Sequence, residues 1–135
     1  MKAILADNNI QGHVQVIFTV LESESWRELW AEVNLPLATF RDIGLTAEVS
    51  DALLWQVCQQ EQVILITANR NADGPDSLEI TLRTRNRADS LPVFTVADVE
   101  RVMRSRDYAE RVAAQLLDYL LDIDNYRGTG RLYLP

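Results

Sequence analysis

The hydrophobic pattern of the chain alternates between short apolar runs and longer stretches with helical periodicity. The run VILIT at residues 63–67 is continuous and mostly β-branched, which is typical of a strand covered on both faces. Further extended segments are predicted at residues 2–6, 35–40 and 91–96. Apolar residues recur at helical spacing in the predicted helices, which cover residues 10–22, 25–33, 51–62, 76–87 and 98–122. Because strands alternate with helices, we predict a three-layer α/β/α sandwich with a central, mainly parallel sheet.

Several helix starts carry capping signals. Ser25 followed three residues later by Glu28 predicts a capping box for the second helix. Either Ser50 or Asp51 is expected to cap the next helix, and Asp98 is expected to cap the last one. Helix capping is therefore the first explanation for the acidic and hydroxyl side chains at these positions, ahead of any chemical role.

The length and composition fit one domain. The chain has 135 residues, of which 47% are hydrophobic, so a sizeable core can form, and this composition argues against wholesale disorder. We expect one domain over residues 1–135, with residues 123–135 as an extension. Its RLYL segment, residues 131–134, is predicted to complete the sheet as a final strand or to form an interface. No run approaches the ~20 apolar residues of a membrane span, and a cytoplasmic location is the expectation.

The charge balance argues against a protein that binds nucleic acid over a broad, basic surface. The formal net charge is −7, and an acidic chain is repelled by a phosphate backbone. A small local site is not excluded by this, because local charge decides local binding. Lys2 is the only lysine, and all other cationic side chains are arginines apart from the single histidine. The arginine guanidinium is the group best suited to bidentate hydrogen bonds with phosphate or carboxylate.

Polar residues collect where the predicted strands end. In an open parallel sheet, binding sites form beyond the carboxyl ends of the strands. The polar residues expected there are Asp7, Asn8, Asn9, Arg41, Asp42, Glu48, Asp51, Asn69, Asn71, Asp73 and Asp76. Such oxygen-rich sets suit Mg²⁺ or Mn²⁺ rather than zinc. A divalent ion held by two or three acids can orient water and stabilise a phosphodiester transition state.

Helix capping is the competing explanation for these acids. Asp and Asn are common at strand ends and helix starts because they satisfy free backbone N–H groups. For Asp98 capping is most of the explanation, whereas for Asp51 and Asp76 capping and a site role weigh equally. Asp7 directly follows a buried strand and lies in a polar triplet. It is therefore the best single functional candidate.

The order of these segments resembles the PIN-like nucleases, in particular small bacterial PIN-like proteins. The resemblance rests on ILADNN at the N-terminus, on FRDIGL followed by SDALLWQVCQQEQVILITANRN, and on the later strand LPVFTV, and covers about the first hundred residues. It implies a parallel α/β/α sandwich and Mg²⁺- or Mn²⁺-dependent cleavage of RNA. By position, Asp7 matches the first acid of the family and Asp51 the acid at the start of the middle helix.

The third acidic motif departs from the family pattern. Where the family usually has Thr-x-Asp-x-Asp, this chain has Thr67-Ala68-Asn69-Arg70-Asn71, so that Asn69 and Asn71 stand in place of the two acids. An amide ligates a hard cation through its carbonyl but adds no negative charge. Asp73 and Asp76 compensate only if their loop, ADGPD, folds back toward Asp7.

Two functional hypotheses follow. In the first, the chain is a PIN-like ribonuclease whose catalytic residues are Asp7, Asp51 and Asp76. Its metal ligands would be Asp7, Asp51, Asp73, Asp76, Asn69 and Asn71, and its substrate contacts Asn9 and Arg70. In the second, the chain is a catalytically inactive PIN-like module that binds a partner protein or a ligand. The acidic net charge and the two asparagines favour the second hypothesis, and the density of acids favours the first. A homodimer is expected by family analogy.

Other reactive residue types have simpler explanations. Arg83, Arg85 and Arg87 alternate near the end of a predicted helix, where cations interact favourably with the helix dipole. That role outweighs a phosphate-binding patch, although the two can coexist. Cys58 and His13 are the only cysteine and histidine. The cysteine is predicted to be a buried, inert thiol and the histidine a structural residue.

Overall fold

The sheet has five parallel strands in the order β2-β1-β3-β4-β5. The computed structural model describes all residues from Met1 to Pro135. The strands are β1 (Ala3–Ala6), β2 (Leu37–Ala38), β3 (Val63–Thr67), β4 (Val93–Val96) and β5 (Arg131–Leu134). The helices are α1 (Gln11–Leu21), α2 (Arg27–Val33), α3 (Asp51–Glu61), α4 (Leu78–Arg85), α5 (Val99–Arg104) and α6 (Arg106–Leu121). Short 3₁₀ turns are η1 (Asn8–Ile10), η2 (Arg41–Ile43) and η3 (Ile123–Tyr126).

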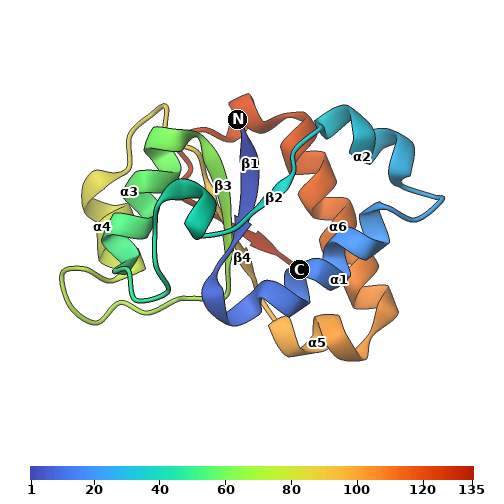
Figure 1. Cartoon of the computed structure of the whole chain (residues 1–135), viewed down its shortest axis with the longest axis horizontal. Coiled ribbons are helices and arrows are strands. Elements are labelled where there is room, and N and C mark those ends of the chain that lie inside the picture. The colour runs from blue at the N-terminus through green and yellow to red at the C-terminus, as the bar shows by residue number, and fades with distance from the viewer.

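Helices cover both faces of the sheet. Figure 1 shows α3 and α4 on one side and α1, α2, α5 and α6 on the other. Successive residues of β3 point to opposite faces: Ile64 and Ile66 pack with α1 and α6, and Val63 and Leu65 pack with α3 and α4. All five residues of β3 are buried. The prediction of a three-layer α/β/α sandwich is therefore confirmed, and the whole sheet is parallel.

The strand predicted at residues 35–40 is much shorter than its apolar pattern indicated. Only Leu37–Ala38 pairs with β1. Pro36 has no N–H to donate, although its carbonyl accepts from the Ile4 N–H at 2.9 Å. On the other side, the carboxylate of Asp42 accepts from the Thr39 N–H at 2.8 Å, which turns the chain into η2. The missing N–H of Pro36 limits the strand at its start, and the local bond between Thr39 and Asp42 limits it at its end.

The predicted capping box at Ser25 and Glu28 is wrong. Helix α2 starts at Arg27, and no side chain caps it. Instead, the carbonyl of Ser23 accepts from the N–H groups of Trp26 and Arg27, so a turn that begins at Ser23 leads directly into the helix. A local backbone turn has replaced the side-chain cap.

The other boundaries are close to the expected ones. Ser50 caps α3 by accepting from the Leu53 N–H, and Asp98 caps α5. The long final helical region is interrupted at Ser105, which ends α5 and caps α6. The RLYL segment forms β5 beside β4, as predicted for a tail that completes the sheet. None of the helices has the length and apolar character needed to cross a membrane.

Candidate functional site

Asp7 lies at the carboxyl end of β1 and is fixed by the neighbouring strand. One carboxylate oxygen, Oδ1, accepts from the Asn8 N–H at 2.7 Å, which caps η1. The other, Oδ2, accepts from the Thr67 hydroxyl at 2.7 Å. Because Thr67 is fully buried at the end of β3, its hydroxyl sets the orientation of the partly exposed Asp7 carboxylate.

A chain of hydrogen bonds connects Asp7 to Asp51. The Thr67 hydroxyl also accepts from the Asn69 N–H at 2.9 Å. The side-chain amide of Asn69 donates to Asp51 Oδ2 at 2.8 Å. Three elements of the fold thus meet here: β1, β3 and the first turn of α3. The sequence pattern identified both acids, but it gave Thr67 no role, although Thr67 matches the threonine of the family's third motif.

The two asparagines use their side-chain oxygens inside the loop. Asn69 Oδ1 accepts from the Asn71 N–H at 2.8 Å, and Asn71 Oδ1 accepts from the Asp73 N–H at 3.0 Å. These are Asx turns, in which the amide holds the backbone two residues further on. The carbonyl oxygens that the metal-site hypothesis assigned to a cation are therefore already engaged with the backbone.

The ADGPD loop lies beside Asp51 rather than Asp7. The carbonyl of Asp76 accepts from the Ala52 N–H at 3.2 Å, which holds the loop against the start of α3. Asp51, Asp73 and Asp76 all line one hollow of about 370 Å³. A separate pocket of about 200 Å³ is lined by Asp7, Asn9, Ile10, Ala68 and Asn69. The loop does not fold back to add its two acids to Asp7.

The arrangement does not fit a preformed Mg²⁺ or Mn²⁺ centre. No three side chains among the His, Cys, Asp and Glu residues come together as a metal-binding group. Both oxygens of Asp7 accept protein hydrogen bonds, and one oxygen of Asp51 accepts from Asn69. A hard divalent cation needs several free oxygens directed at one point, and here the oxygens are distributed over two pockets.

Arg70 points away from the acids. Its guanidinium donates to the carbonyl of Ala97 and lies 5.5 Å from the centre of the Tyr133 ring, within the range of a cation–π contact. The residue as a whole is exposed. Asn9, the other predicted substrate contact, is exposed at the rim of the Asp7 pocket.

Arg131, at the start of β5, holds the end of β3 in place. Its Nη1 donates to the Asn69 carbonyl at 2.8 Å and to the Thr95 hydroxyl at 2.6 Å. Its Nη2 lies 3.4 Å from Glu79 Oε2, and only 8% of the arginine side chain is exposed. The C-terminal tail therefore stabilises the candidate site. Sequence reasoning missed this residue because nothing near Arg131 indicates a partner 62 residues away.

Two further titratable groups have structural explanations. Hydrogen bonds from the N–H and hydroxyl of Thr39 lower the pKa of Asp42, which belongs to the η2 turn and lines neither acidic pocket. Burial raises the pKa of the Cys58 thiol to about 12, and the negative charge of Asp7 adds to this. A thiol with that pKa stays protonated and unreactive at neutral pH.

No family model, curated protein or solved structure matches the chain.

Proposed function

We propose that the chain is a PIN-like module that binds a partner protein through its acidic edge and does not cleave RNA. The observation that carries this proposal is the use of the Asn69 and Asn71 side-chain oxygens by backbone N–H groups. Two of the six predicted metal ligands are then occupied within the loop. The remaining acids are divided between two pockets.

The chemistry of the larger acidic hollow indicates the partner. Asp51, Asp73 and Asp76 line it, and no basic side chain does. These carboxylates do not form a group able to hold one metal ion. A guanidinium or ammonium group carries several donors on a flexible stem, so it can reach separated carboxylates. An Arg- or Lys-rich segment of a partner protein fits this surface, and the net charge of −7 would steer its approach.

The second candidate function is the Mg²⁺- or Mn²⁺-dependent ribonuclease. One observation favours it: Asp7 and Asp51 are joined through Thr67 and Asn69 at the carboxyl edge of the sheet. Mg²⁺ is often held by only one or two carboxylates together with substrate phosphates. In this candidate RNA itself would complete the site, and Asn9 and Arg70 would contact the RNA.

One set of titrations separates the two candidates. An oligoarginine peptide, Mn²⁺ and Mg²⁺ are each titrated calorimetrically into the wild type, Asp7→Asn, Asp51→Asn and Asp73→Asn. The control is Asp118→Asn, because Asp118 is exposed on α6 and far along the chain from either pocket. We expect the peptide to bind about three- to tenfold more weakly to Asp51→Asn and Asp73→Asn, with an affinity that falls as salt rises.

An RNA cleavage screen with Mn²⁺ tests the ribonuclease candidate directly. Cleavage by the wild type that is lost in Asp7→Asn would overturn the binding-module proposal and support the ribonuclease. Absence of peptide binding, of metal binding and of cleavage would reject both candidates. The homodimer expected from the family resemblance is tested separately, by light scattering of the full chain.

A further inference from the structure

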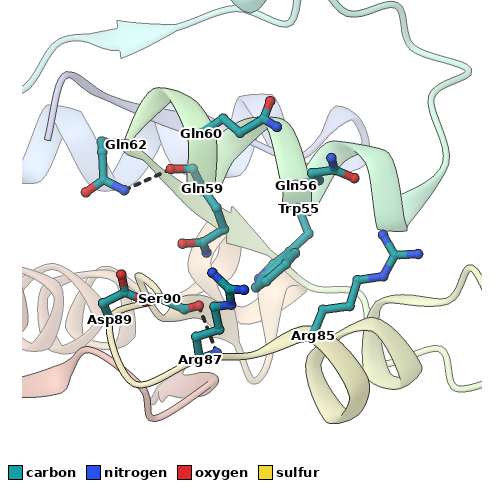
Figure 2. A pocket seen from close by; sticks show the side chains of 9 residues that line it. All are labelled: Trp55, Gln56, Gln59, Gln60, Gln62, Arg85, Arg87, Asp89 and Ser90. Carbon is teal, nitrogen blue, oxygen red and sulfur yellow. Dashed lines mark hydrogen bonds between the residues drawn. The ribbon is translucent and has the colours of Figure 1, made fainter.

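A further polar cavity lies away from the acidic edge. It has a volume of about 490 Å³ and lies between the second half of α3 and the segment that follows α4 (Figure 2). Gln62 and Ser90, which line it, come shortly before the first residues of β3 and β4. The cavity is therefore near the amino ends of these strands, whereas the acids are at the carboxyl ends. Its lining residues are Trp55, Gln56, Gln59, Gln60, Gln62, Arg85, Arg87, Asp89 and Ser90.

Hydrogen bonds across the fold hold the walls of this cavity. Gln59 donates to the Leu91 carbonyl at 2.9 Å and accepts from the Leu91 N–H at 2.8 Å. The Arg127 guanidinium donates to the Asp89 carbonyl at 2.9 Å, and the Gly128 N–H donates to the Ser90 carbonyl at 2.9 Å. Helix α3 thus holds Leu91 and the C-terminal tail holds Asp89 and Ser90, so the cavity is preformed.

Gly128 shows how closely the tail approaches this segment. Its φ is +88°, and a Cβ at this position would lie 2.8 Å from the Ala88 carbonyl oxygen. Only glycine combines that backbone conformation with that approach. The contact places the 86–90 segment directly against the tail and leaves Arg87 on the cavity side.

The cavity holds donors that have no acceptor in the protein. Trp55 is only 6% exposed, and its indole Nε1 has no hydrogen-bond partner. Figure 2 shows this indole extending from α3 into the space between Arg85 and Arg87. Neither arginine takes part in any of the ion pairs of the structure. Asp89 supplies the one carboxylate of the lining, so the lining carries a net positive charge.

We propose that this cavity binds a small organic phosphate of about nucleotide size. A terminal phosphate offers three strong acceptor oxygens, which two guanidinium groups and an indole N–H can satisfy. The volume lies within the ~300–1,000 Å³ typical of small-molecule pockets. The exposed amides of Gln56 and Gln60, one helical turn apart, form hydrogen bonds with the polar remainder of the ligand.

In this proposal, Arg85 and Arg87 rotate to admit the phosphate to the buried donor. Trp55 Nε1 is enclosed in the free protein, while Arg85 and Arg87 are exposed. Because neither guanidinium is held by a carboxylate, both can rotate and then close over the phosphate. The same two arginines also lie at the C-terminal end of α4 or just beyond it, where the helix dipole favours cations, and that role is compatible with phosphate binding.

The test uses the full chain with four probes: adenosine 5′-monophosphate, adenosine, inorganic phosphate and succinate. Affinity is measured by calorimetry for the wild type, Trp55→Phe, Arg85→Gln and Arg87→Gln. The matched control is Arg83→Gln, because Arg83 is exposed on the same helix and does not line the cavity. The Trp55 indole resonance, assigned by its absence in Trp55→Phe, is followed by nuclear magnetic resonance during each titration.

We expect the monophosphate to bind and to shift the Trp55 indole resonance. Removal of either arginine should weaken binding about tenfold, since a charge-assisted hydrogen bond is lost, and Arg83→Gln should leave binding unchanged. Inorganic phosphate should bind more weakly at the same resonance. Adenosine binding as tightly as its monophosphate, or succinate as tightly as phosphate, would overturn the assignment of a phosphate.

A folding control keeps the result interpretable. The arginine variants alter exposed side chains, so their circular dichroism and unfolding midpoint should match those of the wild type. If Trp55→Phe is destabilised, the arginine variants and the indole resonance still decide the outcome. Failure of all four probes to shift that resonance would reject the proposal. It would leave the proposed partner-binding edge unaffected, because the two sites share no residue.

Discussion

The start and the middle of α3 differ in how their polar groups are satisfied. At its start, Asp51 accepts from Asn69, and the adjoining side chains of Asp7, Thr67 and Asn71 also make hydrogen bonds within the protein. In its middle, the Trp55 N–H has no acceptor. The acidic side chains are thus largely satisfied by bonds within the protein, although the neighbouring Arg131 Nε is buried without an acceptor. The unpaired Trp55 N–H lies at a pocket where the exposed Arg85 and Arg87 form no ion pair.

This difference bears on where ligands are expected. A buried donor without a partner costs about 1–3 kcal/mol of stability, so most such groups in proteins have an acceptor. A ligand oxygen at Trp55 Nε1 would remove this cost. By contrast, a ligand at Asn69 or Asn71 would compete with bonds that already exist. A dense cluster of polar residues is therefore a weaker guide to binding than an unpaired buried group.

The largest expected effect comes from removing Arg131, which stabilises the acidic end. Arg131→Met would leave the Asn69 carbonyl and the Thr95 hydroxyl without their donor and would break the pair with Glu79. We expect the free energy of unfolding to fall by about 2–4 kcal/mol, measured by urea denaturation. The double variant with Glu79→Gln should lose less than the sum of the two single variants. If the losses in free energy of unfolding were strictly additive, the ion pair between Arg131 and Glu79 would contribute nothing to stability.

The next effect concerns the wall of the opposite cavity. Gln59→Ala removes both bonds to the Leu91 backbone, and Leu91 is only 1% exposed. Two buried backbone groups lose their partners, so we expect a loss of about 1.5–3 kcal/mol. Gln60→Ala is the control on the same helix: its amide is exposed and should change stability by less than about 0.5 kcal/mol. Equal effects of the two variants would contradict this account of the wall.

Asn69→Asp would make the acidic end resemble the usual family pattern. The substitution replaces the donor to Asp51 with a second carboxylate, and we expect a loss of about 1–2 kcal/mol at neutral pH. The loss should lessen as pH falls, because protonating one carboxyl of the pair restores a donor. Mn²⁺ affinity measured by calorimetry should rise, since the edge gains a charge. Unchanged stability together with unchanged Mn²⁺ affinity would mean that the Asn69–Asp51 bond has little influence.

The smallest effect is a pH dependence at Asp42. Its pKa is lowered by hydrogen bonds from Thr39, so its carboxylate stabilises the fold above the ordinary pKa of an aspartate. That contribution is lost as pH falls through the lowered pKa of the folded state. The difference in melting temperature between the wild type and Asp42→Asn should therefore be present at neutral pH and vanish in acid. A difference that stays constant with pH would contradict the assignment.

Local patterns predicted the fold well because they depend on neighbours in the chain. The continuous run at 63–67 formed the central strand, Ser50 and Asp98 capped helices, and 131–134 completed the sheet. The errors also came from local competition. A turn starting at Ser23 replaced the predicted capping box, and the Asp42 bond to Thr39 shortened β2.

The sequence by itself determined that strands and helices alternate and that Asp7 follows a buried strand. It also determined that Cys58, the only cysteine of the chain, lies within an apolar pattern. These properties follow from spacing along the chain. Only the tertiary structure decided which side chains meet: Asp7 with Thr67, 60 residues apart, and Arg131 with the Asn69 carbonyl. It also decided that the Trp55 N–H has no partner. Hydrogen bonds act over about 3 Å, so their partners depend on the packing of distant segments rather than on the residues beside them in the chain.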